Sequence, residues 1–260
     1  MKKPELTLCG IGAVKARFES DPASFIRLFF DEANGRRLGP LCKALAAARK
    51  VYRCVPPEEL AKIAGSLHHG GVVAIVEPAR LAAPAPRDIA GWAARRTPLV
   101  VLDRIGNPHN LGAIVRTAAF FGIADIIIPA HPDAALPNDA AHRVAEGGME
   151  LVRVWRTSDL PALLRALAAA GYDVVGAATR GGDPETTAAS LAATRKPLAL
   201  VLGNEESGLS PPVTKACTKL VTIQGHGGVE SLNVSVAGAI LLHALGLRGA
   251  PTRKVSPNHG

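Results

Sequence analysis

Residues 98–247 of this chain alternate short, uninterrupted apolar runs with amphipathic stretches, and this rhythm constrains the possible folds more than any other feature. Uninterrupted apolar strands are typical of a parallel sheet that is covered on both faces. Their alternation with helical stretches predicts a doubly wound α/β domain. Strands are expected at 98–103, 126–128, 152–154, 173–178, 198–202 and 220–223, and helices at 110–122, 138–146, 159–170 and 231–246.

Residues 8–78 are expected to form a second, smaller α/β unit, with strands at 51–55 and 72–76. Asp21-Pro22 has the pattern of an N-cap followed by proline at the first helical position. This pattern predicts a helix that packs through the phenylalanines of the 25–30 stretch. Nothing in this half places a nucleophile beside a base, so we interpret it as a binding or positioning module.

Two segments differ in composition from their surroundings. The Ala/Pro-rich stretch within 79–97 is unsuited to a helix interior and is expected to be a linker, anchored by Trp92. Residues 248–260 are rich in Pro, Lys, Arg and Gly and are expected to be a mobile basic tail. The predicted organisation is a module at 8–78, a linker and a catalytic domain at 98–247.

The charge balance indicates a polyanionic partner. Lys and Arg number 30 against 22 Asp and Glu, for a formal net charge of +8, although a general basic bias of the proteome would produce the same balance. Aromatic residues make up only 4% of the chain, which excludes base stacking as the main way of holding nucleic acid.

No apolar run approaches the roughly 18–20 residues of a membrane span, and the N-terminus does not resemble a leader peptide. We therefore expect a cytoplasmic protein. The cysteines form no CxxC pair and have no histidine at metal-ligand spacing, so we expect thiols in a reducing compartment and no metal site. They are Cys9, Cys42, Cys54 and Cys217.

A glycine-bounded turn follows the apolar run at 198–202. The stretch Gly203-Asn204-Glu205-Glu206-Ser207-Gly208 has no Lys-Ser/Thr after its last glycine, which excludes a P-loop, and it lacks the third glycine of a dinucleotide fingerprint. Glycine at this place lets backbone approach a ligand closely, and two carboxylates favour hydroxyl, amine or cationic groups over polyphosphate. A structural turn with solvated carboxylates is an equally good explanation.

Two further polar sets lie at predicted helix starts. Asn110 is a candidate N-cap, and Arg116 offers a planar fork for a phosphate or ribose oxygen. Ser231 is a candidate N-cap of the last helix, with Asn233 in its first turn. The alternative explanation of the first set is a capping Asn with a surface Arg, and that of the second is capping with tight helix packing.

Taken together and in this order, the three sets resemble the motifs of the SPOUT superfamily, and within it the TrmH/SpoU family of RNA 2′-O-ribose methyltransferases. The stretches that carry the resemblance are 110–118, 202–209 and 231–235. A Gly-x-x-x-Val pattern early in the 8–78 module and a His-x-Gly-Val pattern near its end resemble an L30e-like substrate-binding domain.

The resemblance implies an α/β fold whose C-terminal part is threaded into a deep trefoil knot, which general topology rules would not predict. It also implies that S-adenosyl-L-methionine is the cofactor and that no metal is needed. By position, backbone groups of Gly203, Ile223 and Leu232 would hold adenine and ribose. The remaining candidates beside the cofactor are Leu202, Asn204 and Thr179.

The resemblance further implies that Arg116 acts on the target 2′-hydroxyl. Because the pKa of arginine lies above about 12, we expect this residue to align the hydroxyl and stabilise the developing alkoxide rather than to accept a proton. Asn110 and Glu205 would organise the cleft and the arginine, while Ser231 and Asn233 would position the substrate and shape the pocket.

The family resemblance also implies a homodimer with the active site near its interface, and RNA as substrate, with rRNA favoured over tRNA. The apolar, small-residue stretch 237–245 of the last helix fits a packed surface of that kind, although a core helix would have the same pattern. Candidate RNA contacts are Arg104, His109 and Arg143. Two other functions stay open: a base methyltransferase that acts on a guanine nitrogen, and a non-catalytic RNA-binding or ribosome-assembly protein. The presence of both Arg116 and Asn233 argues against the second, and the motifs that contain them argue for ribose.

Overall fold

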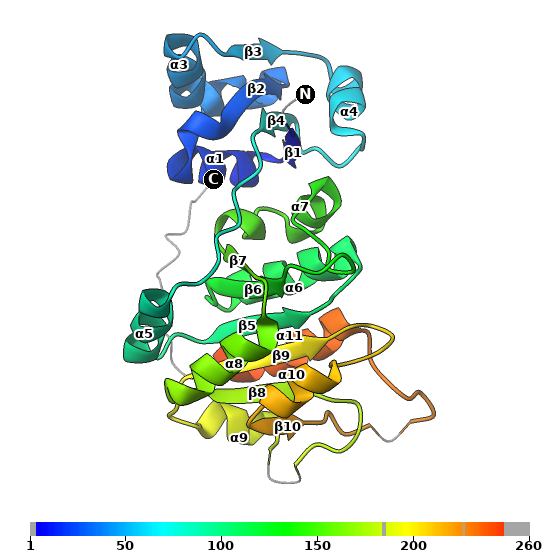
Figure 1. The fold of residues 1–260 in the computed structure, drawn as a ribbon. Coiled ribbons are helices and arrows are strands. Elements are labelled where there is room, and N and C mark those ends of the chain that lie inside the picture. The colour runs from blue at the N-terminus through cyan, green and yellow to red at the C-terminus, as the bar shows by residue number, and fades with distance from the viewer. Residues whose placement is uncertain (1–3, 184–185, 226, 247–260) are drawn as a thin grey trace.

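The computed structural model describes residues 4–183, 186–225 and 227–246. It contains two α/β units, one stacked on the other (Figure 1). The smaller N-terminal unit, blue to cyan in the figure, rests on the larger C-terminal unit, and an extended segment runs from the end of β4 down to α5. The basic tail expected at 248–260 lies outside the described residues.

The N-terminal unit is built on a four-stranded mixed sheet of order β1-β4-β2-β3. β4 runs antiparallel to both β1 and β2, whereas β2 and β3 are parallel. Its elements are β1 Leu6–Cys9, α1 Ile11–Ser20, η1 Pro22–Ser24, β2 Phe25–Phe30, α2 Glu32–Gly35, η2 Arg36–Leu38, α3 Gly39–Ala47, β3 Val51–Cys54, α4 Pro57–Ala64 and β4 Val72–Val76.

The prediction of a helix after Asp21-Pro22 was wrong. Only a short 3-10 turn forms at Pro22–Ser24, and Phe25–Phe30 is strand β2. This strand lies between β4 and β3, where Phe25 and Leu28 are almost fully buried. Pairing on both sides thus overrides the local helix-start pattern, since aromatic side chains suit a buried pleated surface.

The C-terminal unit confirms the predicted α/β class, with a six-stranded parallel sheet of order β10-β8-β9-β5-β6-β7. Its elements are α5 Pro86–Arg95, β5 Leu99–Asp103, α6 Pro108–Phe120, β6 Asp125–Pro129, α7 Asp139–Ala145, η3 Gly148–Glu150, β7 Arg153–Thr157, α8 Leu160–Ala169, β8 Asp173–Ala177, α9 Ala188–Ala193, β9 Leu198–Gly203, α10 Pro211–Ala216, β10 Lys219–Val221 and α11 Val234–Gly246.

Helices cover both faces of this sheet. One face packs against α6, α7, α9 and α11, and the other packs against α5, α8 and α10. The residues of β5 and β9 are buried throughout, as expected for central strands covered on both sides.

The stretch 79–97, expected to be a linker, contains helix α5. Its Pro86 stands at the helix start, where proline is tolerated. Trp92 is only 2% exposed and meets Trp155 edge-to-face, with ring centroids 5.2 Å apart. The helical part of this segment therefore packs with the C-terminal sheet, and the domain boundaries themselves stay a prediction.

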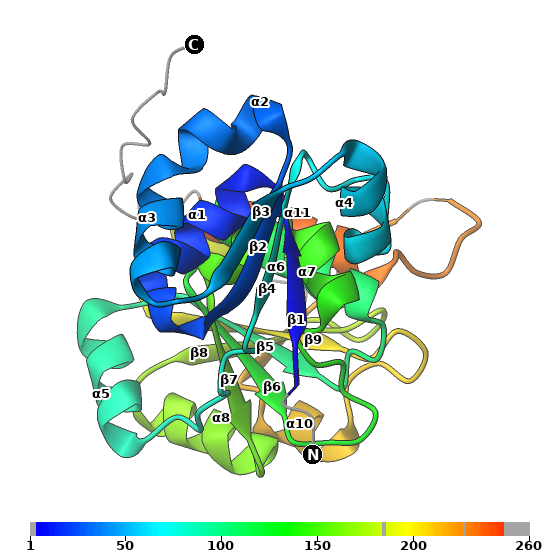
Figure 2. The ribbon, with the colours of Figure 1, turned by 90° about the horizontal axis from the view of Figure 1, so that it is seen from above.

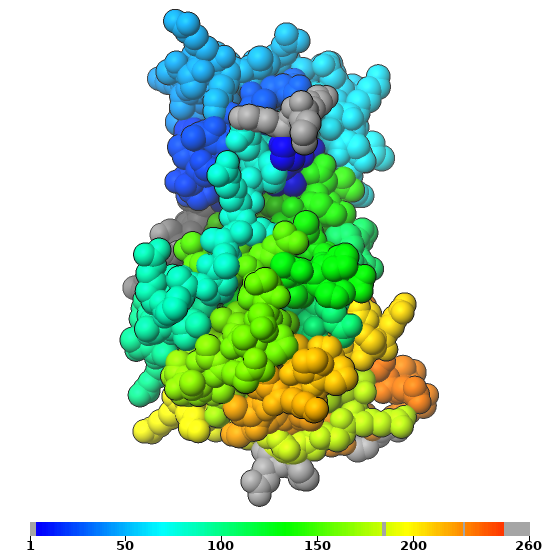
Figure 3. Space-filling model, viewed as in Figure 1, coloured from blue at the N-terminus to red at the C-terminus, as the bar shows by residue number. Residues whose placement is uncertain are grey.

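The two units touch through α1 and β1 on one side and α7 and η3 on the other. Seen from above, α7 lies next to β1 (Figure 2). The backbone N–H of Thr7 donates to Asp139, at 3.1 Å, and the guanidinium of Arg17 forms a buried ion pair with Glu150. The space-filling view shows the N-terminal unit in continuous contact with the unit below it (Figure 3).

Among the described residues, no helix has the length and apolar character that crossing a membrane requires. The trefoil knot stays a prediction from the family resemblance.

Candidate functional site

The candidate site lies at the carboxyl edge of the six-stranded sheet, where β5 and β9 end side by side. Asp103 and Gly203 are paired in register at the last position of these strands. The chain leaves β5 towards β6 on one side and returns to β9 on the other, so the strand order reverses here. Open α/β sheets hold ligands at such a switch point.

Glu205 joins the two loops at this edge. Its carboxylate accepts hydrogen bonds from the backbone N–H groups of Gly106 and Asn107, at 3.2 and 3.3 Å, and from the side-chain amide of Asn110, at 2.8 Å. Burial raises the pKa of Glu205, but these hydrogen bonds outweigh burial and leave the pKa below its ordinary value. The carboxylate is also placed at the N-terminal end of α6, where the helix dipole favours negative charge.

Asn110 lies at the centre of the polar cluster. It donates to Glu205, and its carbonyl oxygen accepts from the amide of Asn233, at 3.2 Å. Only 8% of Asn110 is exposed. The structure thus brings together one predicted residue from each of the three sequence sets: Asn110, Glu205 and Asn233.

The prediction that Asn110 is an N-cap was wrong. α6 begins at Pro108, and the side chain of Asn107 caps it by accepting from the N–H of His109, at 2.8 Å. Asn107-Pro108 is itself the cap-then-proline pattern, so the sequence contained the signal. Freed from capping, the amide of Asn110 is available to link the loop after β9 to the start of α11.

The prediction that Ser231 caps the last helix was also wrong. α11 begins at Val234, and the side-chain oxygen of Asn233 accepts from the N–H and the hydroxyl of Ser235, at 2.8 and 2.6 Å. Ser231 is exposed, and within the described part of the chain its hydroxyl makes no hydrogen bond. It is therefore accessible to a ligand but is not held by this cluster.

Asp103 and Arg104 form a second set of contacts between the loops after β5 and β9, which the sequence did not lead us to predict. The carboxylate of Asp103, 2% exposed, accepts from the N–H of Ser210 at 2.6 Å and pairs with Arg104 at 3.1 Å. The carbonyl of Arg104 in turn accepts from the amide of Asn204, at 2.8 Å. A carboxylate at the end of an otherwise apolar strand was the available signal, because a buried charge needs partners.

Arg116 lies apart from the Asn110–Glu205–Asn233 cluster. Six residues of helix separate it from Asn110, a rise of about 9 Å along α6. Its guanidinium pairs with Glu146, at 2.8 Å, and its side chain is 55% exposed. Within one copy of the chain, the structure therefore does not bring the predicted catalytic arginine into hydrogen-bond contact with the other predicted site residues.

The predicted cofactor residues divide into backbone and side-chain candidates. Leu202 is buried in the core, and the Asn204 side chain is occupied, since its oxygen accepts from Glu206 and Ser207. A Cβ atom on Gly203 would lie 2.4 Å from backbone atoms of Gly208 and Leu209. At 202–204, only the backbone is therefore available to a ligand.

Of the other three candidates, two follow neighbouring strands at the same edge and the third, Leu232, precedes α11. Thr179 follows β8 and is exposed, and Ile223 follows β10 and is half-buried against the core. Leu232 is 48% exposed. An adenosine group requires apolar surface next to main-chain donors and acceptors. The glycine turn and the exposed Leu232 fit that requirement, since Asn110 links Glu205 in the turn to Asn233, the residue after Leu232.

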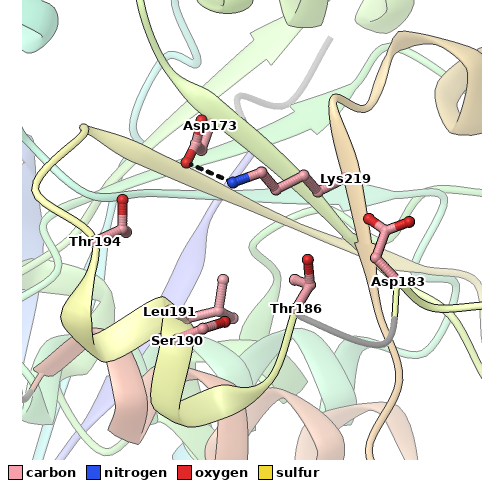
Figure 4. Close-up of a pocket in the computed structure, with 7 residues that line it drawn as sticks. All are labelled: Asp173, Asp183, Thr186, Ser190, Leu191, Thr194 and Lys219. Atoms are coloured by element: carbon pink, nitrogen blue, oxygen red, sulfur yellow. Dashed lines mark hydrogen bonds and ion pairs between the residues drawn. The ribbon is translucent and has the colours of Figure 1, made fainter.

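A pocket of about 460 Å³ lies elsewhere, at the amino ends of β8 and β10 (Figure 4). Lys219 pairs there with Asp173, at 3.2 Å, and α9 forms the floor. Asp173 and Lys219 begin their strands, so this pocket opens away from the edge where Gly203 and Glu205 lie. None of the predicted site residues lines it. Across the described ranges, no group of three His, Cys, Asp or Glu side chains could hold a metal ion.

Two family models match the chain. The one described as "SpoU rRNA Methylase family" matches residues 97–243, and the one described as "RNA 2′-O ribose methyltransferase substrate binding" matches residues 7–82. The first covers the six-stranded unit with the candidate site, and the second covers the four-stranded unit.

Two of the curated proteins that match along most of their length illustrate the similarity. The "23S rRNA (guanosine-2′-O-)-methyltransferase RlmB" of Ralstonia nicotianae is 37% identical over 246 residues, which cover 93% of this chain and 95% of that protein. The "Uncharacterized tRNA/rRNA methyltransferase YfiF" of Escherichia coli O157:H7 is 34% identical over 241 residues, covering 92% of this chain and 67% of that protein.

A solved structure shares the fold. The AdoMet-bound rRNA methyltransferase from Sinorhizobium meliloti superposes with a TM-score of 0.74 at 22% identity, over 92% of this chain and 86% of that one.

Proposed function

This chain belongs to the SpoU rRNA methylase family, and we propose that it transfers the methyl group of S-adenosyl-L-methionine to the ribose 2′-hydroxyl of a guanosine in 23S rRNA. The family assignment rests on the two matches, which together extend over most of the chain. The choice of guanosine and of 23S rRNA rests on the printed activity of the R. nicotianae relative.

The observation that carries the proposal within this molecule is the Asn110–Glu205–Asn233 hydrogen-bonded cluster. It ties the start of α6, the loop after β9 and the start of α11 into one rigid edge. A reaction that transfers a methyl group in line, with no covalent intermediate, depends on such fixed positioning.

S-adenosyl-L-methionine, when bound, supplies an activated methyl on a positively charged sulfur. We place it along the carboxyl edge of β8, β9 and β10, where Thr179, Gly203, Ile223 and Leu232 are candidates to hold it. The buried carboxylate of Asp103 and the hydrogen bonds of Asn204 keep the glycine turn in shape. Leu202 contributes backbone groups, since its side chain is buried in the core.

We assign Arg116 to the target hydroxyl. A guanidinium stays protonated, so its role is to align the hydroxyl and stabilise the developing alkoxide, while the proton leaves to solvent or to a substrate phosphate. We assign Ser231, which is exposed next to Leu232, to the substrate ribose. Basic residues on the same unit that can contact RNA phosphates are Arg104, His109 and Arg143.

We further propose that the chain works as a homodimer that packs through α6 and α11. These helices are in contact, and apolar side chains on their outer surface remain exposed: Phe120 by 82%, Val236 by 49% and Ile240 by 41%. Arg116 lies one helical turn before Phe120 on α6, so it borders this apolar surface. A second copy packed there would bring its own site residues next to Arg116, which makes no hydrogen bond with the other site residues in the described part of its own chain.

The deciding experiment compares 2′-O-methylated nucleosides in 23S rRNA from wild-type cells, deletion cells and deletion cells that carry the gene again. We expect one 2′-O-methylguanosine to be lost on deletion and to return on complementation. Purified protein with labelled S-adenosyl-L-methionine should label a 23S rRNA fragment and not bulk tRNA. Unchanged 2′-O-methylation in all three strains would rule out the proposed reaction.

A further inference from the structure

Five consecutive residues, Glu146 to Glu150, contact both the arginine helix α6 and the N-terminal unit. This segment, the "EGGME turn", leads from the end of α7 into η3. Glu146 adopts a left-handed conformation, with φ 45° and ψ 48°, as does Gly147, with φ 89°. A non-glycine residue rarely adopts this conformation, and its presence at a functional side chain indicates a constraint.

The first residue of the turn holds Arg116. The carboxylate of Glu146 lies 2.8 Å from the Arg116 guanidinium. The backbone is equally close: a Cβ atom on Gly148 would lie 3.2 Å from the Cα atom of Arg116. Both the side chain and the backbone of Arg116 are therefore set against this one turn.

The middle of the turn touches the N-terminal unit. A Cβ atom on Gly147 would lie 3.3 Å from the backbone nitrogen of Ala13, in α1. Glycine at this place permits the close approach of the two units. A displacement of α1 would thus act directly on the backbone next to Glu146.

The last residue of the turn is clamped by the N-terminal unit. Glu150 accepts two hydrogen bonds from the Arg17 guanidinium, at 2.5 and 2.9 Å, and both side chains are about 5% exposed or less. His142, on α7, lies 3.6 Å from the same carboxylate. A bidentate pair removed from water is much more constrained than an exposed one.

We propose that Glu146 is a positioning residue for Arg116, and that the Arg17–Glu150 clamp makes this positioning depend on how the N-terminal unit is docked. The inference rests on the proposed role of Arg116 in methyl transfer. RNA held by the N-terminal unit thereby acts on the arginine through α1, the EGGME turn and Glu146. The clamp is buried, whereas the Glu146–Arg116 pair is exposed and able to rearrange.

The first test is Glu146→Gln, which removes the charge and keeps the shape. At saturating RNA and S-adenosyl-L-methionine, we expect the single-turnover rate to fall about fivefold, the size that an exposed ion pair supports. The affinities for RNA and cofactor should stay unchanged, because Glu146 is not among the residues proposed to hold either of them. Glu5→Gln, which breaks an exposed ion pair with Arg27 in the N-terminal unit, is the matched control and should keep the wild-type rate.

A double-mutant cycle separates positioning from a general structural effect. In an Arg116→Lys background, Glu146→Gln should change the rate less than twofold, since the group that it positions is already altered. Independent, multiplicative effects of the two substitutions would show that Glu146 does not act through Arg116.

The second test removes the clamp without leaving a buried charge unpaired. Arg17→Met combined with Glu150→Leu should lower the rate at saturating RNA about fivefold, and Glu146→Gln should then add less than twofold. Arg17→Gln combined with Glu150→Gln, which also leaves no buried charge, serves as a second variant if the first double variant fails to fold. Wild-type rates in folded clamp variants would overturn the dependence on docking.

The controls separate this inference from the proposed function. A wild-type protein that transfers no methyl group would overturn both together. An active wild-type protein whose Glu146→Gln variant has the same rate would overturn the inference alone.

Discussion

Replacing Glu205 by glutamine tests the physical argument for the candidate site at its most connected residue. The carboxylate accepts from four donors: the backbone of Gly106 and Asn107 and the amides of Asn110 and Asn204. Glutamine keeps one acceptor oxygen and replaces the other by an NH₂ group. Two of the four donors then face another donor.

The expected loss follows from the number of bonds. At about 1 kcal/mol for each lost hydrogen bond at this partly exposed position, the free energy of unfolding should fall by about 2 kcal/mol. For a unit of this size the melting temperature should drop by roughly 6 °C. If the same loops must be ordered around the cofactor, its dissociation constant should rise by up to ~30-fold.

The assay is thermal unfolding together with calorimetric titration of S-adenosyl-L-methionine, with Glu206→Gln as the matched control at the neighbouring position. The pKa of Glu205 is lowered in the folded protein, so its contribution is present above the ordinary carboxyl pKa of 4.5 and is lost as pH falls through the folded value. Wild type and Glu205→Gln should therefore converge in acid. If Glu205→Gln had the same melting temperature and cofactor affinity at pH 7.5 as the control Glu206→Gln, the reasoning would be refuted.

Four further outcomes are expected. Gly203→Ala places a Cβ atom 2.4 Å from the backbone of Gly208, so the free energy of unfolding should fall by about 3 kcal/mol and most cofactor binding should be lost. Gly12→Ala, in open space on α1, is the control and should raise the free energy of unfolding by roughly 0.5–1 kcal/mol in denaturant titrations. Arg116→Lys should lower the single-turnover rate at least tenfold with cofactor affinity unchanged, and near-full turnover would count against a bidentate role. Ile240→Asp should convert a dimer to a monomer in sedimentation velocity at micromolar protein, and a wild-type monomer would remove the shared-site idea. Burial, together with the charge of Arg17, lowers the pKa of His142 from 6.5 to about 4, so roughly 3 kcal/mol of stability present above pH 6.5 should be lost as pH falls towards 4. His142→Gln should flatten that loss in melting curves between pH 7.5 and 5, and an unchanged slope would assign the acid sensitivity to other groups.

The strands of the large sheet were predictable because a strand that is buried on both faces has an uninterrupted run of apolar residues. β5 and β9 read as uninterrupted apolar runs, and the structure buries every residue of both. β2 was not predictable in the same way. The cap-then-proline pattern of Asp21-Pro22 is typical of a helix start. Pairing with β3 and β4 is what makes Phe25–Phe30 extended.

The members of the site were predictable as residue types, but their roles in the local structure were not. Asn110 and Ser231 are both residue types that commonly cap helices, yet the residues that cap α6 and α11 are Asn107 and Asn233. Capping is a local property that several neighbouring residues can satisfy. Which of them does so depends on where the helix docks on the sheet.

The α/β class, the buried strands, the order of the three motifs and the family to which they belong can all be recognised in the amino-acid sequence, because they depend on patterns within short stretches. Two contacts become visible only in the folded molecule: Glu205, 95 residues beyond Asn110, accepts a hydrogen bond from it, and Arg116 pairs with Glu146 instead. Hydrogen bonds and ion pairs act over a few ångströms, and which groups come within that range is set by how the helices pack on the sheet. The glycine turn at 203–208 is therefore recognisable in the sequence, while the contacts that shape it come from strands and helices far along the chain.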